Sequence, residues 1–208
     1  MAVGKEVFLS VKTKKNPVSA RHTVTVRLTT DAVLVAVYVV LSSFVSINLP
    51  IAQFSLSSLP ILLGAVVFGI PDAAAVALCG SFLEQVLYGL SPTAPLWMAA
   101  PLAAALTAGA LTGLFRCLSG GEPRIWQTIV TVVTAELIMT LVNTGMLYLD
   151  AYIMQYTVKS FWVLLPLRLG SGALRTVCTT LLTLGILPPV RLIAARDRTD
   201  GQKGNRGE

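Results

Sequence analysis

Residues Leu59–Leu90 read LPILLGAVVFGIPDAAAVALCGSFLEQVLYGL, and this stretch decides the fold. It holds two apolar runs, Leu59–Ile70 and Ala73–Leu90, which only Pro71 and Asp72 separate. Because a helix needs about 20 residues to cross a bilayer, the second run nearly reaches the required length and the first is clearly short. We therefore expect a membrane hairpin whose first helix is tilted, partly re-entrant or shielded by its neighbours.

Four further apolar runs lie on either side of this hairpin: Ala32–Ile47, Leu96–Phe115, Ile129–Leu149 and Phe161–Leu187. The chain of 208 residues is 54% hydrophobic and 12% charged, and its mean hydropathy is +0.74. Soluble domains carry about 25% charged residues. The composition therefore predicts an all-α integral membrane protein, with one bundle of six transmembrane helices.

The basic residues, which give a net charge of +6, gather in three places. Thirteen of the sixteen lie before Asp31, after Pro189, or around one internal loop at Arg116 and Arg124, and the other three are Lys159, Arg168 and Arg175. An excess of Lys and Arg marks cytoplasmic flanks, and an even number of spans puts both termini on one side. We expect an N-in, C-in topology with a basic cytoplasmic tail (1–30), a transmembrane domain (31–194) and a polar cytoplasmic tail (195–208). Such a distribution argues against nucleic acid as a partner.

The residue types that catalysis and metal binding need are scarce. The single histidine, His22, lies in the polar N-terminal tail, and the three cysteines have no CxxC spacing. The sequence also lacks the GxxxxGK[ST] loop, so it does not hydrolyse ATP in the P-loop manner. We predict no catalytic residue, no metal and no cofactor. Two alternatives stay open: a small membrane enzyme, disfavoured because Glu84 and Glu136 stand on separate helices, and an assembly protein whose charges only join helices.

Polar residues inside the apolar runs indicate a functional site, because ionisable groups within a membrane are costly. At about 1.5 Å per helical residue, Arg168, Glu84 and Asn143 all lie roughly 9–10 Å from the outer ends of their helices. We expect these three side chains, with Gln85, to line an outward-facing pocket. Pro166 and the glycines that follow Arg168 weaken the helix there, which suits a stretch that lines a cavity. The alternative is a permanent Arg168–Glu84 pair.

A second arginine lies deeper in the last run. Arg175 is roughly 18 Å from the inner end of its helix, and Glu136 is roughly 10 Å from the inner end of its own. An arginine side chain covers the remaining gap. We therefore predict that Arg175 and Glu136 form a structural ion pair inside the bundle.

Aromatic residues near the outer ends complete the predicted binding site: Phe54, Trp97 and Trp162. With an arginine fork, they suit a flat or amphipathic molecule that bears a carboxylate. The alternative is that these aromatic rings are anchors at the membrane interface.

Three motifs, in order along six spans, carry a family resemblance. They are AVLVA at Ala32–Ala36, FSLSSLPILLGAVVFG at Phe54–Gly69, and LLPLRLG at Leu164–Gly170. From about Thr30 to Ala195 the chain resembles the S-components, the membrane-embedded substrate-binding subunits of energy-coupling factor (ECF) vitamin importers. The folate-type branch is the most similar.

The resemblance implies a substrate-specific subunit of an ATP-dependent vitamin importer in the bacterial cell membrane. It implies that the small-residue face at Ala32 and Ala36 docks on a transmembrane coupling subunit, and that two cytoplasmic ATPases supply the energy. The predicted substrate is folate or a similar carboxylate-bearing vitamin, and the alternative is another micronutrient such as pantothenate. The vitamin stays open because GIPDAAA departs from the Gly-Pro and glycine-rich start of the third helix in folate-type proteins.

Overall fold

The computed structural model describes residues 17–48, 53–157 and 161–203. This part of the chain forms six helices and one two-stranded hairpin. The elements are α1 (Pro17–Phe44), β1 (Ile47–Asn48), β2 (Gln53–Phe54), α2 (Ser58–Val67), α3 (Ile70–Tyr88), α4 (Ala94–Ser119), α5 (Ile125–Met154) and α6 (Phe161–Lys203). The two strands pair antiparallel, with Ile47 opposite Phe54 and Asn48 opposite Gln53.

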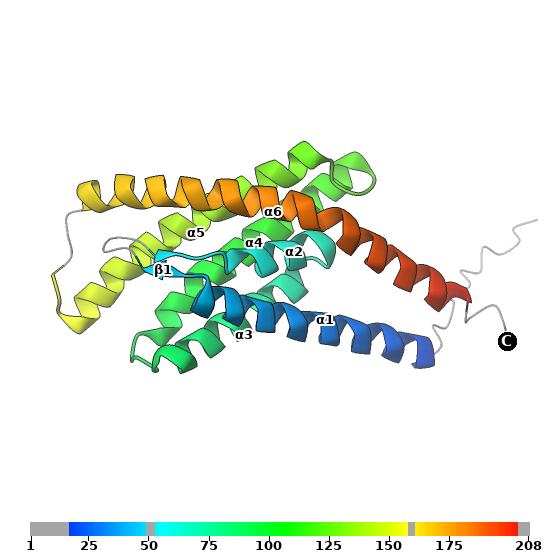
Figure 1. Ribbon diagram of the computed structural model, residues 1–208, viewed down its shortest axis with the longest axis horizontal. Coiled ribbons are helices and arrows are strands. Elements are labelled where there is room, and N and C mark those ends of the chain that lie inside the picture. The colour runs from blue at the N-terminus through cyan, green and yellow to red at the C-terminus, as the bar shows by residue number, and fades with distance from the viewer. Residues whose placement is uncertain (1–16, 49–52, 158–160, 204–208) are drawn as a thin grey trace, which may run out of the picture.

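Five of these helices are long and apolar enough to cross a membrane, and α2 is not. With 10 residues, α2 is roughly 15 Å long, about half of the hydrocarbon core. All of its residues are buried, and it contacts α1, α3, α4 and α6. The sequence predicted six spans with a short second helix; the structure has six helices, and the short one is shielded by its neighbours (Figure 1).

Both ends of α2 are held by side chains from other helices. At its first residue, the hydroxyl of Ser58 donates a hydrogen bond to Oε1 of Glu136 on α5. At its last turn, Nη2 of Arg116 on α4 donates to the carbonyl oxygens of Val66 (2.6 Å) and Val67 (3.3 Å). The last carbonyls of a helix have no partner within the helix, so Arg116 satisfies groups that the buried position shields from water.

The tight link between α2 and α3 depends on Gly69. Its φ is +108°, a conformation that only glycine adopts readily, and it reverses the chain within two residues. Directly after the link, Asp72 in the first turn of α3 pairs with Arg27 of α1. A carboxylate at that position also complements the helix dipole. The link that the sequence predicted at Pro71 and Asp72 therefore connects α2 to α3 and, through Asp72, ties both to α1.

Small residues let the helices approach closely. A Cβ atom on Gly80 of α3 would lie 2.7 Å from Cδ1 and Cγ of the Tyr38 ring on α1. A Cβ atom on Gly109 of α4 would lie 2.9 Å from Cα of Ile70 at the start of α3. Close approach at small residues is the packing mode that membrane helices favour, and it places Tyr38 in the main core cluster.

The first and last helices extend beyond the apolar runs. The sequence predicted spans beginning at Ala32 and ending before Pro188, whereas α1 begins at Pro17 and α6 continues to Lys203. Polar residues continue a helix once it leaves the bilayer, so hydropathy marks the membrane segment and not the helix end. In Figure 1, α6 changes direction between its orange and red parts. Pro188 and Pro189 lie inside α6 and have no backbone donor, and proline is a usual cause of helix kinks.

The N-terminal end of α1 and the C-terminal end of α6 lie at the same end of the bundle, as Figure 1 shows. The α2–α3 link and the loop between α4 and α5 lie at that end too, and the hairpin and the α3–α4 and α5–α6 links lie at the other. An even number of passes would produce this arrangement. The short helix α2 supplies the return pass, although it covers only half the distance.

Candidate functional site

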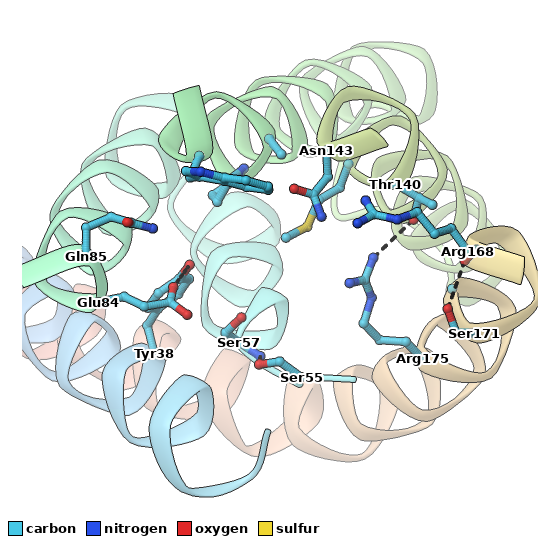
Figure 2. A pocket seen from close by; sticks show the side chains of 15 residues that line it. Tyr38, Ser55, Ser57, Glu84, Gln85, Thr140, Asn143, Arg168, Ser171 and Arg175 are labelled. Atoms are coloured by element: carbon cyan, nitrogen blue, oxygen red, sulfur yellow. Dashed lines mark hydrogen bonds between the residues drawn. The ribbon is translucent and has the colours of Figure 1, made fainter. Parts of the chain in front are cut away.

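A cavity of about 260 Å³ opens between the helices (Figure 2). Every helix except α2 contributes a side chain, and the connection between β2 and α2 adds two serines. The lining residues are Tyr38, Ser55, Ser57, Glu84, Gln85, Trp97, Ala100, Pro101, Met139, Thr140, Asn143, Arg168, Ser171, Gly172 and Arg175.

The cavity brings together five of the seven residues predicted to bind a substrate. Glu84 and Gln85 come from α3, Trp97 from α4, Asn143 from α5 and Arg168 from α6. Figure 2 shows Glu84 and Gln85 on one side of the space, and Arg168 on the other, with Asn143 between them along the rim of the view. The common depth that the sequence indicated therefore corresponds to one shared cavity.

The wall formed by α6 is cationic. Arg168 and Arg175 are seven residues apart, which is two helical turns, so both side chains lie on the same face. Within the described residues, Nε of Arg168 is buried and has no hydrogen-bond partner, and its guanidinium forms no ion pair. A buried donor without a partner is energetically unfavourable, so the Nε–H of Arg168 can bind an acceptor atom of a ligand.

Arg175 is anchored more firmly than Arg168. Its Nε donates to Oε2 of Glu136 at 2.9 Å, and its Nη2 donates to Oγ1 of Thr140 at 3.1 Å. The Glu136 side chain is 1% exposed, and it also accepts the bond from Ser58. The pair anticipated from the sequence therefore joins α5 and α6 to the start of α2, and Arg175 contributes to the cavity wall at the same time.

The opposite wall is anionic. The Tyr38 hydroxyl donates to Oε2 of Glu84 at 3.0 Å, and the tyrosine itself is 1% exposed. Among the described residues, no cation lies within ion-pair distance of Glu84. The sequence left open a permanent pair between Arg168 and Glu84; the two side chains stand apart on opposite sides of the cavity (Figure 2).

Two predicted site residues do not contribute to the described cavity. Trp162 is 80% exposed near the start of α6 and does not line the cavity, as expected for an aromatic residue at the membrane interface. Position along α6 does not fix the direction of a side chain, so the role of Trp162 in substrate binding stays a prediction. The backbone of Phe54 lies in β2, and its side chain lies outside the described residues.

Several lining residues carried no signal in the sequence. Ser55 and Ser57 lie in the short connection between β2 and α2, and Tyr38 and Ser171 lie inside apolar segments, where a hydroxyl often bonds to its own helix. Ser171 does so here, because its Oγ donates to the carbonyl oxygen of Arg168 at 3.0 Å. A charged residue in an apolar run indicates a function because its burial in the membrane is unfavourable, whereas a hydroxyl gives no such indication.

The chain just after α5 approaches the cationic wall. The hydroxyl of Tyr156 donates to Oδ2 of Asp150 at 2.6 Å. Partial burial and the Asp150 carboxylate raise the pKa of Tyr156 to about 12, and the positive charge of Arg168 opposes this shift. The guanidinium of Arg168 therefore lies near enough to this segment to act on it electrostatically.

Comparisons with known proteins identify the chain's relatives. The family model described as "ECF transporter, substrate-specific component" matches residues 26–187. No curated protein matches the sequence. One solved structure, described as the S component of a bacterial ECF transporter, is 17% identical, with a TM-score of 0.59, and the match covers 81% of this chain and 97% of that chain.

A second solved structure, ThiT from Listeria monocytogenes, is 19% identical, with a TM-score of 0.53, and the match covers 86% of this chain and 97% of that one. At these identities the two structures establish a shared fold. The family model, in turn, spans more than half of the chain and nearly all of the described bundle. The chain therefore belongs to the substrate-specific components of ECF transporters, multi-pass membrane subunits that bind a substrate and act with a membrane coupling subunit and ATPases rather than as enzymes.

Proposed function

We propose that this subunit captures a carboxylate-bearing vitamin in the cavity between α3 and α6. The observation that carries the proposal is the state of Arg168, whose buried Nε has no partner among the described residues. A guanidinium binds a carboxylate through two parallel hydrogen bonds, and such charge-assisted bonds are the stronger kind. Arg175, fixed by Glu136 and Thr140, stands on the same wall two turns away.

The size of the cavity bears on which vitamin it receives. About 260 Å³ lies just below the range of roughly 300–1,000 Å³ typical of pockets for drug-sized ligands. Both folate and pantothenate carry a carboxylate, and the volume favours pantothenate, the smaller of the two. Trp97 and Met139 supply apolar surface for the uncharged part of either molecule.

Mass spectrometry of small molecules that co-purify with the protein in detergent tests this proposal. We expect a carboxylate-bearing molecule with the wild type and its loss with Arg168→Gln. Arg124→Gln, which removes an exposed arginine at the start of α5, is the matched control and should keep the molecule. Retention by Arg168→Gln, or a co-purifying molecule without a carboxylate, would contradict the proposal.

The proposal includes an orientation. With the basic ends of α1 and α6 in the cytoplasm, the segments 1–30 and 195–208 are cytoplasmic tails, and the cavity opens to the outside. Support comes from Figure 1, where both helix ends lie at the end of the bundle that bears the loop of Arg116 and Arg124. In intact cells, a membrane-impermeant maleimide should not label a variant whose only cysteine is Cys117. It should label a variant that lacks the native cysteines and carries Thr157→Cys. The reverse pattern would overturn the orientation.

A further inference from the structure

The wall that faces the arginines has a chemistry of its own. Glu84 projects from α3 into the cavity, with the Gln85 amide beside it and the Tyr38 hydroxyl bonded to one of its oxygens. The carboxylate thus has one acceptor atom engaged by a neutral donor and further acceptor capacity toward the cavity. This wall lies across the space from Arg168 and Arg175 (Figure 2).

A purely structural role for Glu84 fits these contacts poorly. A carboxylate in a membrane-spanning helix is normally paired with a cation, because an uncompensated charge there is costly. Among the described residues Glu84 has none within 4.0 Å, and Arg168 on the far wall is not paired with it. Glu84 and Arg168 carry opposite charges, yet they lie on opposite walls of the cavity and do not form an ion pair.

The position of Glu84 is also fixed from behind. The Tyr38 ring packs against Gly80, where a Cβ atom would come within 2.7 Å of it, so the ring is held closely against α3. Its hydroxyl is the 3.0 Å donor to Glu84. A preorganised acceptor of this kind binds a partner without paying to immobilise its own side chain.

We propose that Glu84, held by Tyr38, is an acceptor subsite for a hydrogen-bond donor group at the end of the ligand remote from its carboxylate. This inference rests on the proposed function, and it narrows the substrate class to bipolar molecules. Such a molecule carries a carboxylate at one end and an amine, amide, ring N–H or hydroxyl donor at the other. The Arg168 wall holds the first end and the Glu84 wall holds the second.

Titration of the purified protein with four carboxylates tests the inference, with the fluorescence of Trp97 in the cavity wall as one readout and calorimetry as a second. Folate, biotin and pantothenate bear N–H or O–H donors at the end remote from the carboxylate, and lipoate bears none there. We expect at least one donor-bearing probe to bind, and lipoate to bind at least tenfold more weakly than the best of them. Glu84→Gln should weaken the best probe by about 10- to 100-fold, the range for a lost hydrogen bond to a charged group.

Glu122→Gln provides the matched control, because it makes the same change on the exposed loop between α4 and α5. It should leave the affinity unchanged. Glu84→Asp keeps the charge and should recover part of the affinity lost in Glu84→Gln, which loss of folding alone would not allow.

The outcomes separate the two proposals. If lipoate binds as tightly as the best donor-bearing probe and Glu84→Gln leaves every affinity unchanged, the acceptor subsite is refuted while the carboxylate site stands. If Glu84→Gln abolishes binding of a probe and Arg168→Gln does not change it, the acceptor subsite stands and the carboxylate site on α6 is refuted. Loss of affinity in both variants, with the Glu122→Gln control unaffected, supports a bipolar ligand.

Discussion

The hydroxyl of Tyr38 on α1 donates a hydrogen bond to the carboxylate of Glu84 on α3, across a distance of 3.0 Å. This bond joins the candidate ligand cavity to the helix that carries Ala32 and Ala36. Both alanines are exposed on α1, and Tyr38 is buried on its other face. One helix therefore has two surfaces, one toward the cavity and one that is exposed.

Removal of the Tyr38 hydroxyl should weaken the contact between α1 and α3 while the packing of the ring is kept. We expect Tyr38→Phe to lower the free energy of unfolding by about 1.5–3 kcal/mol, because the bond is made to a charged group and the partly buried carboxylate of Glu84 loses its donor. The measurement is thermal unfolding in detergent without ligand. Tyr88→Phe is the control, since its hydroxyl makes only a 3.4 Å contact with the Ser42 carbonyl between the same two helices. An equal effect of the two substitutions would contradict the prediction.

The packing of the same tyrosine makes Gly80 a sensitive position. Gly80→Ala places a methyl group 2.7 Å from the Tyr38 ring, so we expect destabilisation of about 1–3 kcal/mol, the usual cost of overpacking. Gly145→Ala on α5 meets nothing within 4 Å and should be neutral or stabilising by up to about 1 kcal/mol, since alanine favours helix. Comparison of the two melting temperatures checks this. A Gly80→Ala variant as stable as the control would show that α1 and α3 are packed less closely.

The Arg175–Glu136 pair should behave as a unit. Arg175→Met leaves the carboxylate of Glu136, which is 1% exposed, without its cation, and such a change costs about 3–5 kcal/mol. In the double variant Arg175→Met, Glu136→Gln no uncompensated charge remains, so part of the stability should return. A double-mutant cycle from unfolding in detergent measures the coupling. Additive losses would mean that the two residues contribute separately.

The family resemblance implies that the face of α1 with Ala32 and Ala36 docks on the coupling subunit, and this expectation can be tested. Ala36→Trp adds a large ring to that face, on the side of the helix away from the cavity. It should abolish uptake by cells that supply the coupling subunit and ATPases, and leave ligand affinity of the purified protein within about twofold. Leu106→Trp changes an exposed position on α4 and should keep both activities. Loss of binding together with uptake in Ala36→Trp would place this face in the ligand site instead.

Charge and depth were enough to predict much of the candidate site from the sequence. Arg168, Glu84 and Asn143 are rare types in apolar runs, and their similar distance from the helix ends places them around one cavity. Trp97 lines this cavity too, whereas Trp162 does not. Both tryptophans stand near helix ends in the sequence, and only the rotation of each helix, which depends on its neighbours, separates them.

Tyr38 shows where sequence reasoning stops. Nothing in the run Ala32–Ile47 distinguishes it from an interfacial aromatic residue, because its importance depends on Gly80 and Glu84, more than 40 positions away. The helix ends escaped prediction for a different reason. Hydropathy reports the solvent around a helix, and α1 and α6 remain helical where that solvent changes from lipid to water.

The burial of α2 constrains how the chain enters the bilayer during synthesis. A helix of 10 residues, all of them enclosed by other helices, presents no surface to lipid and spans only half of the hydrocarbon core. The insertion machinery selects segments by their stability in lipid, so α2 has too little length to be retained alone. Because Gly69 folds it directly against α3, the two helices are expected to insert as one hairpin, and α2 stays at membrane depth only once α4 and α6 have closed around it.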